Sequence, residues 1–146
     1  MATLSMYLNF AGTTEDYILG YTGQMTYLNQ RLERVITHIL ETSPHPPVII
    51  LQGDHGPGAF LNWDSVEQTC AKERFSILNA YYFPDGDYQG LYSSISPVNS
   101  FRVILDKYFN FRQDILPDNI YYATWSHPYD LVDITNQVNT CNWTKP

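Results

Sequence analysis

The stretch Pro-Pro-Val-Ile-Ile-Leu-Gln-Gly-Asp-His-Gly-Pro-Gly, residues 46–58, places a short apolar run directly before a turn rich in glycine and proline. A short apolar run bounded by turn residues is typical of a strand that is buried on both faces, as in a parallel sheet. In open α/β sheets, ligands bind at the carboxyl ends of such strands. The stretch therefore predicts a buried strand that ends in a functional turn.

Asp54 and His55 stand side by side in this turn. Neighbouring side chains of a regular strand point to opposite faces, but Gly53 and Gly56 free the backbone from that alternation. A carboxylate oxygen and an imidazole nitrogen then suit a shared Zn²⁺, Mn²⁺ or related divalent ion. Catalytic metal sites use about three protein ligands or more, so the alternative is an ordinary turn with Asp54 capping the backbone and His55 exposed.

The flanking segments predict helices and further strands. Apolar residues recur at helical spacing from Thr22 to Leu40, and the proline-rich segment 42–47 ends that helix. The other expected elements are a strand or ordered arm over 1–10, a short helix over 64–73, a strand over 75–83, a helix beginning at Ser96-Pro97, and short strands over 120–124 and 131–135. This order predicts an α/β fold, a partial doubly wound, mainly parallel sheet flanked by helices, in a single domain spanning residues 1–146.

Composition narrows the classes of partner. The net charge of −7 and the scattered Lys and Arg residues offer no basic patch, which argues against a nucleic-acid partner. No run of the sequence approaches the roughly 20 apolar residues of a membrane span. The sequence therefore predicts a soluble chain that makes no membrane contact of its own.

The cysteines and the remaining histidines carry no metal-site pattern. Cys70 and Cys141 are far apart in the sequence, and a disulfide between them is compatible with the sequence but not indicated by it; we interpret them as buried thiols. His38 is predicted to lie in a helix and His45 in a loop, and both are interpreted as structural or surface residues. His127 reads as a loop histidine, with a role as an additional metal ligand as the alternative.

Several segments together resemble sulfatase-like proteins of the alkaline phosphatase superfamily, near the lipoteichoic acid synthase and phosphoglycerol transferase branch. The resemblance runs from about Tyr21 to Tyr122. The segments that carry it are Tyr-Leu-Asn at 27–29, the quoted stretch over 47–58, Glu-Arg-Phe at 73–75, Leu-Asn-Ala-Tyr-Tyr-Phe-Pro at 78–84, and Ser-Pro-Val-Asn-Ser-Phe-Arg at 96–102.

The resemblance implies part of a metal-dependent hydrolase or phosphoglycerol-type transferase that acts on sulfate or phosphate esters. Asp54 and His55 match two ligands of the family's divalent ion (Mn, Zn, Mg or Ca). Arg74 is a candidate for the catalytic arginine that follows this pair in sulfatases. Its alternative role is an ion pair with a neighbouring carboxylate.

This chain departs from the family pattern upstream of the Asp-His pair. The family's nucleophile and its N-terminal acidic ligand lie well before that pair, and neither Thr13, Thr14 nor Thr22 has a setting that resembles the nucleophile's. The chain is therefore expected to be the C-terminal portion of a sulfatase-like catalytic domain, with an incomplete metal site and no activity by itself. By resemblance, the parent protein is membrane-anchored with an extracytoplasmic catalytic domain.

Two other hypotheses stay open at this stage. The chain could be a non-catalytic interaction or scaffold domain that forms a homo-oligomer through an exposed sheet edge. It could also be a plain α/β domain whose turn happens to contain Asp-His.

Overall fold

The computed structural model describes residues 12–142, so the strand or arm expected over residues 1–10 lies outside the described residues. The longest element is helix α1, Thr14–Thr42, which confirms the predicted helix and extends it at its start. Thr13 and Asp16 form a capping box, in which the Asp16 N–H donates to Thr13 Oγ1 and the Thr13 N–H donates to Asp16 Oδ2. The helix ends at Thr42, and Ser43 is its extended C-cap, because the following Pro44 disfavours helical backbone at the residue before it.

α1 packs loosely against the rest of the chain. None of its residues is buried, although apolar residues at helical spacing such as Tyr21, Met25 and Leu32 are half-buried. Leu28 and Val35 belong to the same stripe by their spacing and remain 45% and 51% exposed. The apolar face of α1 is therefore only partly covered by the described residues.

The prediction of a parallel, doubly wound sheet is wrong. Within residues 12–142 the strands form two antiparallel pairs: β1 (Ile49–Gln52) with β2 (Asn79–Tyr82), and β3 (Tyr121–Tyr122) with β4 (Val132–Asp133). Parallel neighbours need a crossover connection, usually a helix that runs the length of the strand. The connection from β1 to β2 contains only the four-residue helix α2, Ala71–Arg74, and it returns the chain alongside β1. Helices thus account for most of the regular structure.

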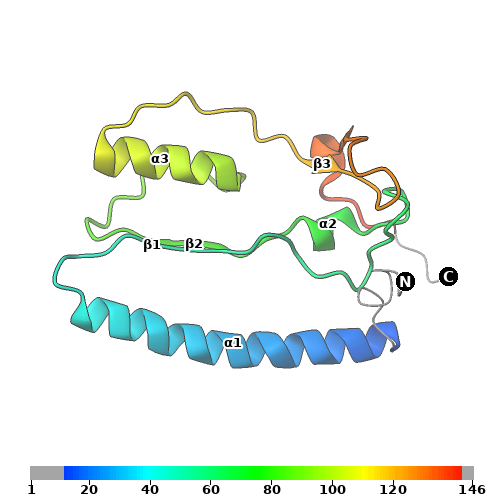
Figure 1. Ribbon diagram of the computed structural model, residues 1–146, viewed down its shortest axis with the longest axis horizontal. Helices are drawn as coiled ribbons and strands as arrows, with labels where there is room; N and C mark the ends of the chain where they lie inside the picture. The colour runs from blue at the N-terminus through cyan, green and yellow to red at the C-terminus, as the bar shows by residue number, and fades with distance from the viewer. Residues whose placement is uncertain (1–11, 143–146) are drawn as a thin grey trace, which may run out of the picture.

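Figure 1 shows the β1–β2 ribbon between α1 on one side and helix α3, Pro97–Phe109, on the other. Asn79 and Tyr81 of β2 point toward α3, since the Asn79 side-chain amide donates to the Ile95 carbonyl and the Tyr81 hydroxyl hydrogen-bonds Ser100. The N-cap at Ser96 and the proline that opens α3 confirm the predicted helix start. The expected helix over 64–73 and strand over 75–83 are present only as the shorter α2 and β2.

The buried residues that form a cluster lie at the α2 end of the molecule, while Phe83, Ile95 and Ile104 are buried outside it. Ala71, Tyr122 and Ile134 form the buried cluster, so the core joins α2 to β3 and to the residue before the short 3₁₀ helix η2, Thr135–Gln137. The Tyr122 hydroxyl donates to the carbonyl of Asn62. No helix within residues 12–142 combines the length and the apolar character that crossing a bilayer requires.

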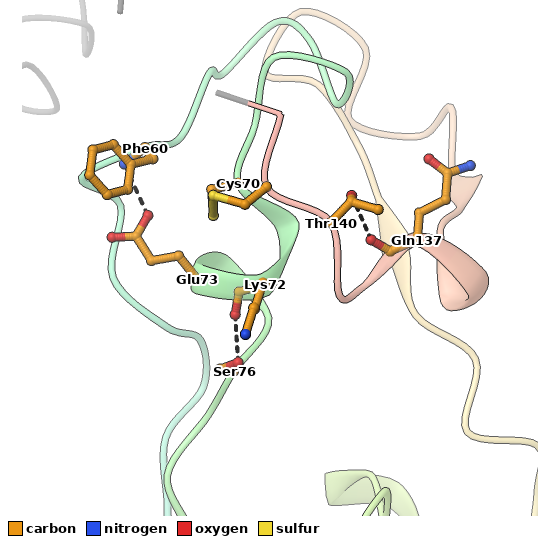
Figure 2. The surroundings of a disulfide bond; sticks show 8 residues. Phe60, Cys70, Lys72, Glu73, Ser76, Gln137 and Thr140 are labelled. Atoms are coloured by element: carbon orange, nitrogen blue, oxygen red, sulfur yellow. Dashed lines mark hydrogen bonds between the residues drawn. A yellow bond between two sulfur atoms is a disulfide. The ribbon is translucent and has the colours of Figure 1, made fainter. Parts of the chain in front are cut away.

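Cys70 and Cys141 form a disulfide, so their interpretation as free buried thiols was wrong (Figure 2). The bond joins residues separated by 71 positions and ties the C-terminal segment to the start of α2. A backbone hydrogen bond from the Lys72 N–H to the Thr140 carbonyl, 3.0 Å, reinforces the same contact. Sequence separation hid the pairing, because only the packing of the C-terminal segment on α2 brings the two cysteines together.

A charged cluster fastens α3 to the loop that follows β2. Lys107 Nζ lies 2.6 Å from Asp87 Oδ2 and 3.0 Å from Asp85 Oδ2, and the Tyr108 hydroxyl donates to Asp85. The hydrogen bond from Lys107 lowers the pKa of Asp87, and the same bond is the main cause that raises the pKa of Lys107. The loop and the helix are therefore joined by an interaction that depends on pH.

We expect the Cys70→Ser/Cys141→Ser double variant to lose about 4 kcal/mol of unfolding free energy, because a disulfide that closes a long loop restricts the unfolded chain. Urea denaturation followed by circular dichroism measures the difference. Dithiothreitol should destabilise the wild-type protein and leave the double variant unchanged. Equal urea midpoints for the two proteins under oxidising conditions would contradict the structural role of the bond.

We expect Lys107→Met to lower the urea midpoint near neutral pH and to have little effect in strong acid. The Asp87 carboxylate has a depressed pKa in the folded state, so its stabilising contribution is present above its ordinary pKa of 3.8 and is lost as the pH falls through the folded-state value. Lys72→Met removes the same charge outside the cluster and serves as the control. If Lys107→Met lowers the urea midpoint by the same amount at every pH, the effect comes from lost packing and not from the lost ion pair.

Candidate functional site

The turn that carries Asp54 and His55 is pressed against α2 through Gly56. The Gly56 N–H donates to the Arg74 carbonyl at 2.7 Å. A side chain at position 56 would overlap the carbonyl oxygen of Glu73 and lie 2.7 Å from that of Ser76. Glycine is therefore required here by the close approach of two backbones, and that approach brings Arg74 next to the turn.

The side chains of Asp54 and His55 lie close together at this turn. His55 Nε2 is 3.6 Å from Asp54 Oδ2, while the His55 backbone N–H holds the other carboxylate oxygen at 3.0 Å. Two ligands about 2.1 Å from one ion are 3.6 Å apart when they subtend roughly 120°. Both side chains are accessible, with 52% of His55 and 89% of Asp54 exposed. The pair can accept an ion between Nε2 and Oδ2.

The other imidazole nitrogen has two neighbours that favour different tautomers. His55 Nδ1 lies 2.8 Å from the Gly56 carbonyl oxygen and 2.8 Å from Arg74 Nη1. If Nδ1 carries the proton, it donates to Gly56, as metal-bound histidines commonly donate to a carbonyl, and the Nε2 lone pair faces Asp54. If Nδ1 accepts from Arg74, Nε2 carries the proton and can donate toward Asp54. Only the first tautomer presents a metal ligand.

Arg74 adds a positive charge beside the imidazole. Its Nη1 also donates to the Gly56 carbonyl at 3.1 Å, and its guanidinium carbon lies 5.9 Å from the centre of the Trp63 ring. No carboxylate of residues 12–142 forms a salt bridge with it. The alternative role of Arg74 as one half of an ion pair therefore finds no partner in the described part of the chain.

The turn, Arg74 and Trp63 line an open cavity of about 1180 Å³. The start of α3 and residues 116–123 line the same cavity. Neutral polar and apolar residues make up much of the remaining lining, including Asn79, Ser93, Ser94, Ile95, Asn119, Tyr121 and Asn139. The Asp-His pair and Arg74 are thus charged groups at the side of a large, mostly uncharged cavity.

A buried polar network joins the start of α3 to the segment 116–118, both of which line the cavity. The Asn99 amide N–H groups donate to the Leu116 carbonyl at 2.7 Å and to Asp118 Oδ1 at 2.9 Å, and Asn99 Oδ1 accepts from the Leu116 N–H at 3.0 Å. Tyr92 donates to the second oxygen of Asp118, and this bond is the main cause that raises the pKa of Tyr92. Burial acts to raise the pKa of Asp118, but hydrogen bonds from Ser96, Tyr92 and Asn99 outweigh it and lower that pKa.

This network explains part of the motif over residues 96–102 and was missed by sequence reasoning. Asn99 and Ser100 are fully buried, and both act in the fold: Asn99 binds the 116–118 segment, and Ser100 bonds the Ser96 carbonyl and Tyr81. An asparagine one turn into a helix that is followed by Leu-Pro-Asp could have indicated such an anchor. Proximity between positions 99 and 118 cannot be read from the sequence.

The remaining candidate residues do not join the Asp-His pair. Within residues 12–142, no group of three or more His, Cys, Asp or Glu side chains is placed to hold a metal ion. His127 contacts Ser126 at 3.1 Å. The threonines considered as nucleophiles serve α1, since the Thr13 hydroxyl caps the helix and the Thr22 hydroxyl bonds the Ile18 carbonyl. Asp54 and His55 are therefore a pair without a third ligand in the described part of the chain.

Comparison with known proteins identifies no relative: no family model, no curated protein and no solved structure matches this chain.

We expect Gly56→Ala to destabilise the protein by about 2 kcal/mol, because the added methyl group forces the turn away from α2. Gly20→Ala is the matched control. It lies inside α1, in the second turn, with open space around its position, so the substitution should stabilise the helix by about 0.5–1 kcal/mol. Thermal melts of the two variants measure both changes, and a Gly56→Ala variant as stable as wild type would contradict the close approach.

Proposed function

We propose that this chain supplies an Asp54–His55 metal-ligand pair and the anion-binding Arg74 to a metal-dependent enzyme that acts on sulfate or phosphate esters. The observation that carries the proposal is the arrangement around the His55 ring. In the metal-binding tautomer His55 Nε2 faces the Asp54 carboxylate at 3.6 Å and Nδ1–H meets the Gly56 carbonyl, to which the Arg74 guanidinium, without a carboxylate partner among the described residues, also donates. A divalent ion and an arginine placed around one imidazole suit a tetrahedral oxyanion.

The residues divide the work between them. Asp54 Oδ2 and His55 Nε2 would hold the ion, which when bound polarises an ester oxygen as a Lewis acid. Arg74 would bind a second oxygen of the ester, because its fork of N–H donors matches oxyanions. Gly56 positions both groups by docking the turn on α2. The further ligands and the nucleophile that such an enzyme needs would come from outside residues 12–142.

The disulfide supports the extracytoplasmic location that the resemblance implies. Disulfides form and persist in oxidising compartments and are rare in the reducing cytosol. The Cys70 side chain is buried, being 4% exposed, and the bond ties the segment that carries Arg74 to the C-terminal residues. We therefore place the parent protein outside the cytosol, with its ester-binding cavity facing that compartment.

Isothermal titration of Mn²⁺ and Zn²⁺ tests the ligand pair. We expect Asp54→Ala/His55→Ala to abolish the binding heat or to weaken affinity at least about tenfold, since the loss of one coordinating group commonly costs that much. His38→Ala/Glu41→Ala also removes one histidine and one carboxylate, from the exposed surface of α1, and should leave binding unchanged. Equal binding by wild type and by the Asp54/His55 variant would refute the site.

Arg74 requires a second titration, with inorganic sulfate or phosphate in the presence of Mn²⁺. Arg74→Met should weaken anion binding about tenfold or more while Mn²⁺ binding stays within error, because a hydrogen bond to a charged group is worth roughly 1.5–3 kcal/mol. Arg74→Lys keeps the charge but loses the fork, so an intermediate affinity is expected. Anion affinity that does not change in either variant would remove Arg74 from the proposal.

A further inference from the structure

Strand β1 has one side without a strand neighbour. Among residues 12–142 it pairs with β2 alone, although its residues Ile49, Ile50 and Leu51 are all apolar. An uninterrupted apolar run of this kind is typical of a strand buried on both faces, and α1 and α3 lie on the two faces of the ribbon (Figure 1). β1 carries no charge and no proline, which are the features that natural proteins use to protect an exposed edge from pairing.

The pairing with β2 determines which backbone groups the free edge presents. The Gly53 N–H donates to the Leu78 carbonyl, so the hydrogen-bonded pairs of this antiparallel ribbon include positions 53, 51 and 49. The N–H and C=O groups of Ile50 and Gln52 then point away from β2. They form a row of two donors and two acceptors along the free edge.

We propose that a second copy of this chain pairs with this edge, β1 against β1 across a two-fold axis centred on Leu51. In that register Ile50 of each copy stands opposite Gln52 of the other, and all four outward groups of each strand are used. The Leu51 side chains of the two copies face each other as a non-hydrogen-bonded pair. The neighbouring antiparallel registers pair some of these groups with residues outside β1, so this is the register in which the strand complements itself within Ile49–Gln52.

The surrounding helices favour this occupant. A two-fold axis perpendicular to the ribbon keeps the α1 helices of both copies on the same face of the joined sheet, since α1 lies on one side of the ribbon (Figure 1). The half-exposed stripe of α1, including Leu28 and Val35, can then contribute apolar area that four-residue strands alone do not supply. A stable dimer needs a total buried area of about 1,200 Å² or more. This surface is independent of the proposed metal chemistry.

The net negative charge of the chain opposes dimerisation, and the salt dependence of the dimer therefore tests the proposal. Each copy carries a net charge of −7, so the dimer brings two acidic chains together. Salt screens this repulsion, and the dimer should therefore strengthen as ionic strength rises. A contact dominated by attraction between opposite charges would show the reverse dependence.

Sedimentation equilibrium of the wild-type protein, at low and at high salt, tests for a dimer. Leu51→Cys then tests the register, because a non-hydrogen-bonded pair places its Cα atoms about 4.5 Å apart, within reach of a disulfide. We expect a cross-linked dimer on a non-reducing gel, with the peptide joined to its own copy through position 51 identified by mass spectrometry. Ile49→Cys lies on the same strand and face but four positions from its own counterpart in the proposed register, and it should not cross-link.

Leu51→Lys provides a second measurement that needs no oxidation. Two lysines facing each other across the axis should lower the association constant at least tenfold, since like charges directly opposite in a sheet are destabilising. Leu19→Lys is the control, because Leu19 lies off the apolar stripe of α1 and is already 74% exposed. If the protein is a monomer at every concentration and salt level, the proposal is wrong, and a strand from another polypeptide would be the alternative partner for the edge. If a dimer forms but cross-links equally at positions 49 and 51, the proposed register is wrong.

Discussion

The close approach of Gly56 to the backbone of α2 is the contact on which the candidate site depends. α2 is a single turn, and a helix of four residues has no stability of its own in water. It is held at its start by the Cys70–Cys141 disulfide and at its end by the hydrogen bond between Gly56 and Arg74. The C-terminal segment, α2 and the Asp54–His55 turn are therefore linked in series, and Arg74 reaches the imidazole only because each link is in place.

The electrostatics of the site follow from this arrangement. The chain is acidic overall, yet Arg74 is brought to the cavity without a carboxylate partner among residues 12–142. By contrast, Lys107 is satisfied by two aspartates at the far end of α3. Arg74 is instead held by the Gly56 carbonyl and by the face of the Trp63 ring, so its charge is left without a neutralising carboxylate among the described residues.

The helices were predictable and the sheet was not. α1 and α3 begin at local signals, a Thr-Thr-Glu-Asp cap and a Ser-Pro pair, and their apolar spacing extends over several turns, so neighbouring residues suffice to define them. The apolar run of β1 predicts a strand, but it carries no information on the direction of its neighbour. That direction depended on the path of residues 53–78, which contain only the four-residue helix α2 and bring the chain back antiparallel to β1.

The sequence by itself determined the two long helices, the strand before the turn, and the presence of Asp54 and His55 at the end of that strand. Tertiary structure alone decided that the sheet is antiparallel, that Cys70 pairs with Cys141, that Asn99 anchors the segment at Asp118, and that Arg74 lies against His55. The physical reason is the separation along the sequence over which each kind of interaction acts. Helix periodicity, caps and turns act between residues a few positions apart, whereas these four contacts join residues 19 to 71 positions apart or require the path of a whole connection.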